Sequence, residues 1–214
     1  MTRLAIILIL SLAGSPGAAQ TMIGCHKDQA RIAVQALRDA KRLTLEAATN
    51  LGDSPEYTRW FGAYSRPHAE KVRANFKSVL RAIRTGAVAI QCDALGDDGC
   101  GDDAYAWVYP GEPYRLHICP AFFDLPTMRD FQPAARASKN GTREGTVIHE
   151  LSHFNRVART DDHCYSRPDC ERMAAENAAK AVDNADSYQY FAEDIAYFSR
   201  QLIRSKPVPT DRPD

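Results

Sequence analysis

The stretch TVIHELSHFNRVARTDDHCY, Thr146 to Tyr165, contains the pattern His-Glu-x-x-His at His149, Glu150 and His153. On a helix, residues four apart lie on one face about one turn apart, so both histidines can direct ring nitrogens at one ion. Glu150 is offset by about 100° around the axis, so it reaches a metal-bound water rather than the metal. This pattern predicts a zinc site with Glu150 as general base.

A chance match on a surface helix is the alternative. A random occurrence of this pattern is expected in well under about one chain in a hundred. Apolar residues also surround the motif here, and two histidines and a carboxylate buried without a metal would carry a desolvation penalty. We therefore favour the zinc site. The apolar neighbours are Val147, Ile148, Leu151 and Phe154.

Two histidines leave the site short of the three protein ligands that are typical of catalytic zinc. The metzincin pattern requires Gly at position 156 and His at position 159, where this chain has arginine. A glutamate about twenty residues further on, as in thermolysin-like enzymes, is available at Glu171 or Glu176. Asp161 and Asp162 are nearer, because a short carboxylate in the turn after the helix can fold back to the metal.

The first 19 residues have the features of a secretory signal peptide: Arg3, an apolar run from Leu4 to Ala13, and small residues before Gln20. The run is too short to span a bilayer, and no later segment has about 18 uncharged apolar residues. We expect cleavage near Ala19, a secreted or periplasmic protein, and no membrane attachment afterwards.

The remaining residues are enough for one domain, which we predict over residues 20–205. The whole chain has 27 cationic and 27 acidic residues, so its charge gives no electrostatic footprint for nucleic acid. Three prolines in residues 206–214 indicate a disordered tail. The Gly- and Asp-rich loop at 97–103 lacks the spacing of an EF-hand calcium site.

Periodicity predicts an α+β fold that is mainly helical. Apolar steps of three and four predict helices over 32–47, 67–83, 146–157, 173–182 and 188–202. Short strands are expected at 87–92 and on both sides of the turn at 110–113. In the last of these strands, Leu116 and Ile118 should be buried, and Arg115 and His117 should face water.

Six cysteines in an exported chain predict three disulfides. They allow fifteen pairings, and spacing alone favours only Cys164 with Cys170.

Three segments together resemble the aspzincin metallopeptidases, the family of deuterolysin and the fungal peptidyl-Lys metalloendopeptidases. They are His149–Phe154, Thr160–Tyr165 and Asn184–Tyr188. Tyr109–Tyr114, Cys119–Phe123 and Trp60–Gly62 are similar to the same family, so the likeness runs roughly from Cys25 to Ala196.

The resemblance implies a zincin-type fold and one Zn²⁺ per chain, held by His149, His153 and Asp162. It also implies that Glu150 is the base and that Tyr165 donates a hydrogen bond to the developing oxyanion. The implied activity is hydrolysis of peptide bonds in protein or peptide substrates, and we expect a monomer. For the disulfides, the family suggests Cys25 with Cys92 and Cys100 with Cys119.

In Lys-directed members of the family, a carboxylate at the position that matches Asp186 helps to form an acidic pocket for the side chain just after the scissile bond. A Glu three residues later assists it. This chain has Asp186 but Gln189, so we expect a preference for Lys at P1′ with weaker discrimination. An alternative role for Asp186 is capping of the last helix. The family usually has Gly where this chain has Arg159 and Ser166. The competing functional hypothesis is a zinc- or peptide-binding protein that has lost turnover, although zinc binding alone does not need Glu150.

Overall fold

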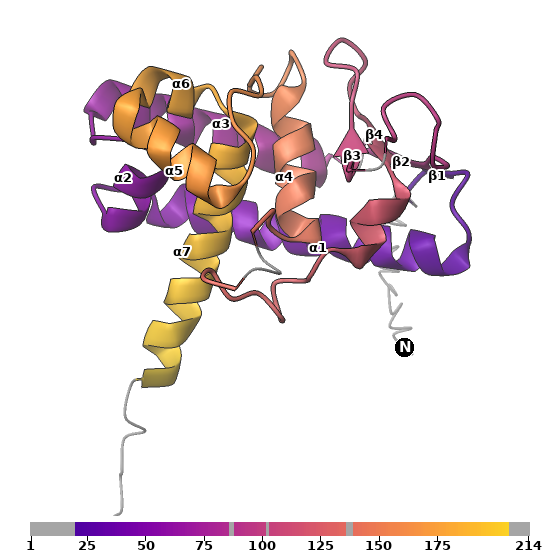
Figure 1. Ribbon diagram of the computed structural model, residues 1–214, viewed down its shortest axis with the longest axis horizontal. Coiled ribbons are helices and arrows are strands. Elements are labelled where there is room, and N and C mark those ends of the chain that lie inside the picture. Colours follow the sequence, from indigo (N-terminus) through magenta and orange to yellow (C-terminus); the bar gives the residue numbers. More distant parts are fainter. Residues whose placement is uncertain (1–19, 86–87, 102, 136–138, 206–214) are drawn as a thin grey trace, which may run out of the picture.

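The computed structural model describes residues 20–85, 88–101, 103–135 and 139–205, with side chains as far as residue 199. The predicted signal peptide and the predicted tail, residues 1–19 and 206–214, lie outside the described residues. Within the described part, helices predominate and are joined by one small sheet, in agreement with the predicted fold class (Figure 1). No helix in that part is both long and apolar enough to cross a membrane.

Helix α1 (Lys27–Asn50) runs beneath most of the molecule and packs against α3 (Arg66–Arg84), α4 and α7. It begins with a capping box between His26 and Gln29. Its last turn has no basic residue, and Arg73 of α3 instead donates to the carbonyls of Ala48 and Leu51 at its C-terminal end. Arg73 therefore satisfies two carbonyls at the end of α1 that have no partner within the helix.

Helix α2 (Pro55–Phe61) was not predicted. Seven residues are too few to show a helical period, but Ser54 caps the first turn and Pro55 follows it. Its aromatic residues Tyr57, Trp60 and Phe61 are all fully buried, at 0% exposed. The helix is therefore stabilised by tertiary packing against α5 and α7 rather than by its own length.

The sheet has the strand order β1-β2-β4-β3. Strands β1 (Met22–Ile23), β2 (Ala89–Cys92) and β4 (Arg115–Ile118) are parallel, and β3 (Ala106–Trp107) pairs antiparallel with β4. The prediction that His117 faces water is wrong. His117 is 5% exposed, its ring stacks on Trp107, and its Nδ1 lies 2.8 Å from a carboxylate oxygen of Asp93.

After the short 3₁₀ helix η1 (Pro120–Asp124), the described part of the C-terminal half contains four α-helices. Helix α4 (Arg143–His153) ends at the second histidine of the motif, earlier than predicted. The helix predicted over 173–182 is two helices, α5 (Arg167–Glu176) and α6 (Ala178–Val182). Asn177 separates them, because its side chain caps the first turn of α6.

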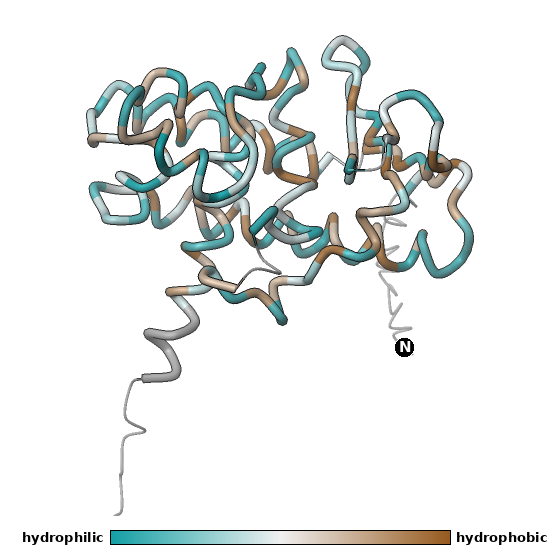
Figure 2. Tube along the Cα trace, in the orientation of Figure 1, coloured by the Kyte–Doolittle hydropathy of each residue, from teal (hydrophilic) through white to brown (hydrophobic). Residues whose placement is uncertain are grey.

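Helix α7 (Ala185–Ser205) crosses the molecule against α4, and their buried faces form the centre of the core. Apolar segments follow the inner helices and the strands in Figure 2. The three disulfides join Cys25 to Cys92, Cys100 to Cys119, and Cys164 to Cys170, which are the pairs that the sequence and the resemblance predicted.

Candidate metal centre

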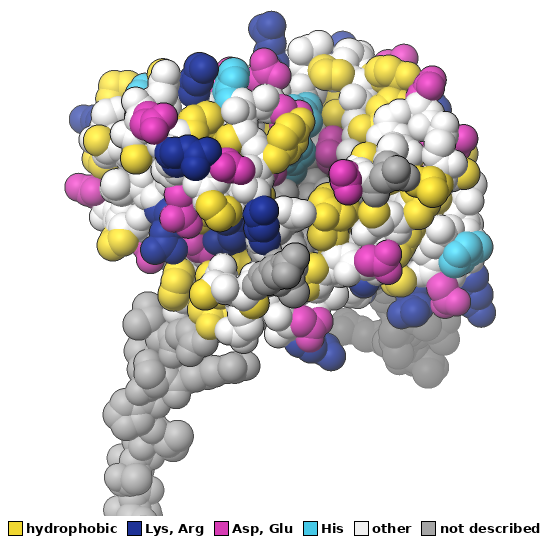
Figure 3. All heavy atoms as spheres, in the orientation of Figure 1, with side chains coloured by type: hydrophobic (Ala, Val, Ile, Leu, Met, Phe, Trp, Pro, Cys, Tyr) yellow, Lys and Arg dark blue, Asp and Glu magenta, His cyan; other side chains and the backbone are white. Residues whose placement is uncertain are grey.

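A cleft of about 850 Å³ lies between residues around β3 and the first turns of α7 (Ala185–Ser205). Its floor is α4, one wall is residues 103–108 around β3, and the other is the turn at 160–166. Figure 3 shows the hollow with histidine side chains inside it. The cleft therefore lies over the His-Glu-x-x-His motif at His149, Glu150 and His153.

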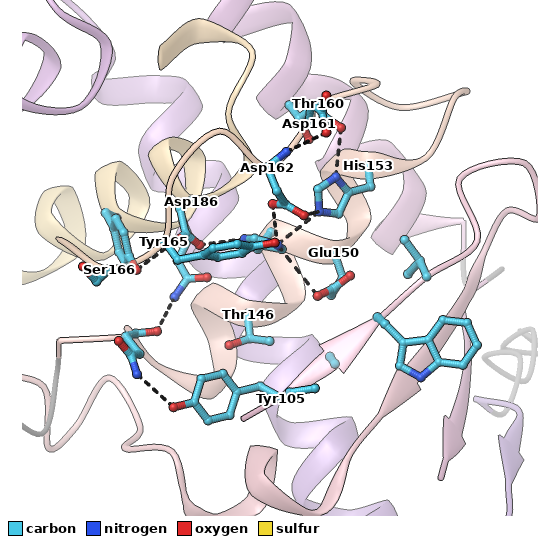
Figure 4. A pocket seen from close by; sticks show the side chains of 18 of the residues that line it. Tyr105, Thr146, Glu150, His153, Thr160, Asp161, Asp162, Tyr165, Ser166 and Asp186 are labelled. Atoms are coloured by element: carbon cyan, nitrogen blue, oxygen red, sulfur yellow. Dashed lines mark hydrogen bonds and ion pairs between the residues drawn. The ribbon is translucent and has the colours of Figure 1, made fainter. Parts of the chain in front are cut away.

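His149, His153 and Asp162 all line this cleft, and Figure 4 shows the carboxylate of Asp162 beside the ring of His153. The Nε2 atoms of His149 and His153 lie 3.1 Å apart. The carboxylate of Asp162 reaches both, with Oδ1 3.3 Å from His149 Nε2 and Oδ2 3.5 Å from His153 Nε2. The turn that follows α4 has thus folded back over the motif.

These separations suit a tetrahedral zinc ion. With bonds of about 2.0–2.1 Å, two ligand atoms of such an ion lie about 3.3 Å apart. The three observed separations fall between 3.1 and 3.5 Å. The donor set of two imidazole nitrogens and one carboxylate is also one that zinc prefers. The residues present therefore fit the metal.

Glu150 and Tyr165 border the same point from different elements. The Oε1 atom of Glu150 lies 3.8 Å from His149 Nε2, and the residue is 6% exposed. Tyr165 is 62% exposed overall, but its hydroxyl hydrogen-bonds to the carboxylate of Asp162. Burial of that hydroxyl, and then the negative charge of Asp162, raise the pKa of Tyr165, so the phenol stays protonated.

Each histidine ring is held through its other nitrogen. His153 Nδ1 lies 2.9 Å from the carbonyl of Thr160, and His149 Nδ1 lies 2.7 Å from Asp186 Oδ1. The second oxygen of Asp186 accepts a hydrogen bond from Tyr190 at 2.9 Å. Sequence reasoning missed these partners of the histidines, because Asp186 follows His149 by 37 residues and only tertiary contact joins them.

The buried charges shift one another's pKa. Burial lowers the pKa of His149, but its hydrogen bond to Asp186 and the charges of Asp186, Glu150 and Asp162 outweigh that effect and raise it to about 9. Burial raises the pKa of Glu150 to about 7, against the opposing effect of His149. Burial and the neighbouring His149 lower the pKa of His153. These directions describe the protein without a bound metal.

Gln189 lines the cleft one helical turn beyond Asp186. It is 2% exposed, and its Nε2 donates to the carbonyl of Asn140 at 3.1 Å. The side chain of Asn140 in turn donates to the Tyr105 hydroxyl at 3.0 Å. A neutral amide, fixed by a backbone carbonyl, therefore lines the cleft one helical turn from the carboxylate of Asp186.

The two glutamates that were considered as alternative third ligands do not line the cleft. Glu171 lies instead in a shallow depression with residues of α2, and Glu176 is exposed at the end of α5. Asp161 lines the cleft, but its backbone bridges to Asn184 and its side chain accepts from the amide of Asp162.

Comparison with known proteins agrees with this geometry. The family model of the aspzincins, described as lysine-specific metallo-endopeptidase, matches residues 46–193. A peptidyl-Lys metalloendopeptidase of Pleurotus ostreatus is 30% identical over 178 residues, which cover 81% of this chain and 96% of that protein. An extracellular protease of Aeromonas hydrophila is 34% identical over 146 residues, 68% of this chain but only 38% of that protein.

The chain spans less than half the length of several relatives, including the Aeromonas protein and a peptidyl-Lys metalloendopeptidase of Armillaria mellea, of which it covers 37%. Among solved structures, a zinc peptidase from Grifola frondosa shares the fold, with a TM-score of 0.67 and 24% identity over 79% of this chain and 97% of that one. The family model covers more than half of the chain, and its match includes the motif helix, the turn with Asp162, and Asp186. The chain belongs to the aspzincin family of metallo-endopeptidases.

Proposed function

We propose that this protein is an exported endopeptidase that uses one zinc ion per chain, held by His149, His153 and Asp162. The observation that carries the proposal is the convergence of these three side chains. The two Nε2 atoms lie 3.1 Å apart, and the two carboxylate oxygens of Asp162 lie 3.3 Å from His149 and 3.5 Å from His153, which are separations typical of zinc ligands. Family membership and the names of the relatives support the same activity.

Zinc, when bound, supplies Lewis acidity, which polarises a peptide carbonyl and makes water acidic near neutral pH. Glu150 is a buried carboxylate beside the ligand atoms, so it can accept the proton of the attacking water and pass it to the leaving amine. The Tyr165 hydroxyl, kept protonated beside Asp162, can donate a hydrogen bond to the oxygen that becomes negative.

The wall of the cleft suits an extended peptide. Strand β3 stands at the edge of the sheet, and the contiguous residues 103–108 line the cleft beside α4. An edge strand offers backbone donors and acceptors to a peptide that lies alongside it. We infer that the substrate is an extended segment within a chain rather than a compact ligand.

We propose a preference for Lys at P1′, which rests on the charge of the cleft. Five carboxylates line it, and no lysine or arginine is among its described lining residues; the five are Asp103, Glu150, Asp161, Asp162 and Asp186. Three named relatives are peptidyl-Lys enzymes. Because Asp186 already accepts hydrogen bonds from His149 and Tyr190, and Gln189 is neutral, we expect weaker discrimination than two free carboxylates would give.

Export is supported by the three disulfides, which persist in oxidising compartments. The name of the Aeromonas relative, extracellular protease, points in the same direction. We propose that the protein acts outside the cytoplasm, as a monomer.

The experiment is incubation of the purified mature protein with a denatured protein, with and without a metal chelator, followed by mass spectrometry of the new amino termini. We expect chelator-sensitive cleavage with Lys enriched at the new termini. Glu150→Ala should bind zinc but abolish cleavage, whereas Glu171→Ala, outside the cleft, should retain both. Equal cleavage by Glu150→Ala would refute the enzyme proposal, and scattered residues at the new termini would refute only the Lys preference.

A further inference from the structure

A buried cation lies behind the turn that holds Asp162 and Tyr165. Arg167 is 4% exposed, and its Nη2 donates to Glu193 Oε2 at 3.1 Å and to Asp194 Oδ1 at 2.8 Å. Both acidic partners are 0% exposed. The guanidinium carbon also lies 4.9 Å from the centroids of three aromatic rings, those of Trp60, Phe131 and Tyr190.

Glu193, the first partner of Arg167, is hydrogen-bonded to the start of the motif helix α4. The other oxygen of Glu193, Oε1, accepts hydrogen bonds from the backbone amide and the hydroxyl of Thr142, at 2.7 and 2.8 Å. Thr142 is the N-cap of α4, and its hydroxyl also accepts from the amide of Gly145 at 3.0 Å. The Arg167–Glu193 pair therefore fixes the first turn of the helix that carries His149, Glu150 and His153.

Tyr190, whose ring lies beside Arg167, is connected through Asp186 to the proposed zinc ligand His149. Tyr190 packs under the guanidinium, and its hydroxyl donates to Asp186 at 2.9 Å. The other oxygen of Asp186 contacts His149 Nδ1. The position of the Tyr190 ring, and through it the direction of the Asp186 carboxylate, thus depends on what fills the space occupied by Arg167.

Arg167 is the first residue of α5 and directly follows the turn at 160–166. It follows Ser166, which has a positive φ of 70°, and lies two residues after Tyr165. Its amide donates to the carbonyl of Lys139 at 3.1 Å. One residue therefore contacts the start of α4 through Glu193, the partner of His149 through Tyr190, and the turn that presents Tyr165.

We propose that Arg167 is a positioning residue, which sets the turn carrying Asp162 and Tyr165 in register with the motif helix. One guanidinium nitrogen, Nη2, donates to both carboxylates while the planar group lies among three rings. A lysine ammonium can supply the charge but has no plane to pack against the rings. The consequence for catalysis rests on the proposed peptidase function. The geometric claim, that Arg167 holds the turn in place, does not depend on it.

A purely stabilising role is the competing explanation, and Arg59 provides the matched control. Arg59 lies on α2 and pairs with the same Asp194, through Nη1 and Oδ2 at 3.4 Å, but its side chain is 39% exposed. Among the described residues, no hydrogen bond or ion pair joins it to α4 or to the turn. Loss of either arginine should lower the melting temperature. Only loss of Arg167 should also disturb the site.

The test compares Arg167→Met, Arg167→Lys and Arg59→Met with the wild-type protein, well below their melting temperatures. If the wild type shows chelator-sensitive cleavage, Arg167→Met should lower kcat by about a hundredfold with little change in KM, because small misplacements of catalytic groups have effects of that size. The kcat of Arg167→Lys should lie between those of the wild type and Arg167→Met, because lysine keeps the charge but has no planar group to pack on the rings. Arg59→Met should keep the wild-type kcat.

Hydrogen exchange of the zinc-loaded proteins gives a readout that needs no activity. In Arg167→Met, the amides of residues 160–166 should exchange about tenfold faster or more, because the turn opens locally, whereas Arg59→Met should leave them unchanged. If Arg167→Met does not fold, Arg167→Lys decides by the same two measurements. Wild-type kcat and wild-type exchange in the Arg167 variants, or equal effects in the Arg59 variant, would overturn the proposal. A wild type without cleavage would refute the peptidase function, and exchange alone would then decide the role of Arg167.

Discussion

The Nδ1 atom of His149 lies 2.7 Å from Oδ1 of Asp186, a residue that sequence comparison alone associates with substrate selection. Asp186 is 5% exposed, and its other oxygen is occupied by the Tyr190 hydroxyl. A carboxylate in this position fixes the ring orientation of a metal-ligating histidine and makes its free nitrogen a better donor. In the proposed zinc site, the same residue would hold one ligand in place and contribute its charge to the cleft.

Asp186→Asn should weaken zinc binding by about ten- to hundredfold, because partners of this kind tune metal affinity by that amount. The amide has the shape of the carboxylate and can still accept from Nδ1, so the variant removes mainly the charge. Asp183→Asn, which changes a surface acid three residues earlier, is the control. Zinc dissociation constants from competition with a coloured chelator provide the measurement. An unchanged constant for Asp186→Asn would contradict this role.

Zinc affinity should rise with pH up to about 9. The pKa of His149 is about 9 in the protein without metal, where the hydrogen bond and charge of Asp186 overcome the lowering effect of burial. Below that pH zinc must displace a proton, so its apparent affinity should increase by up to about tenfold per pH unit and then level off. In Asp186→Asn the levelling should occur at lower pH. A wild-type affinity that is flat between about pH 7 and 9 would show that His149 is not protonated there.

Tyr165→Phe should lower kcat by about a hundredfold and leave KM nearly unchanged, because the hydroxyl contributes only to charge that develops in the transition state. Tyr109→Phe is a suitable control, since Tyr109 is another exposed tyrosine, next to the cleft wall, whose hydroxyl makes no contact with the ligand residues. Steady-state kinetics on one peptide would separate the two parameters. Equal rates for the two variants would assign Tyr165 to packing only.

Gln189→Glu should sharpen the preference for Lys at P1′ by about tenfold, because it adds a second negative charge near Asp186. The variant also places a carboxylate where an amide donates to the carbonyl of Asn140, in a residue that is 2% exposed, so its stability should fall by about 1–3 kcal/mol. Matched peptides with Lys or norleucine at P1′ provide the measurement, as a ratio of kcat/KM values. Gln132→Glu, on a loop outside the cleft lining, is the control. A ratio that does not change would place the P1′ pocket elsewhere.

The sequence was sufficient to predict the parts of the fold that have a local signature. The helical period over residues 188–202 marks α7, and the spacing of His149 and His153 fixes the face of α4. The fold-back of Asp162 followed from family resemblance, and the structure supplies its physical reason. The two positions where the chain has lost the family glycines, Arg159 and Ser166, both have positive φ, at 54° and 70°. The turn between them needs that backbone, whichever residue occupies it.

The features that could not be predicted depend on contacts between distant segments. Helix α2 is too short to have a period, and its Trp60 is bound to Asp194, which lies 134 residues later. The alternation in β4 predicted that His117 is exposed to solvent, but the register with β3 pairs it with Trp107, whose ring stacks on the imidazole. No local pattern reveals such partners, because burial of a polar side chain is decided by what packs against it.

Removal of two of the disulfides should affect stability and activity in opposite order. Cys164–Cys170 closes a short loop, with a separation of 6 residues, directly around Tyr165, whereas Cys25–Cys92 spans 67 residues and joins the strand side of the molecule. Replacing the first pair by serine should cost about 2 kcal/mol of stability, and replacing the second about 4 kcal/mol, because loop-closure entropy grows with loop length.

The order of the two variants should be reversed for activity measured well below the melting temperature. The Cys164→Ser, Cys170→Ser variant should lose about tenfold or more in kcat, because the turn that presents Tyr165 is no longer fixed to α5. The Cys25→Ser, Cys92→Ser variant should keep its kcat, since neither cysteine lines the cleft. Chemical denaturation and kinetics on the same preparations provide both quantities. If the variant without Cys25–Cys92 instead lost more kcat than the variant without Cys164–Cys170, the Cys164–Cys170 disulfide would stabilise the fold without positioning the turn that carries Tyr165.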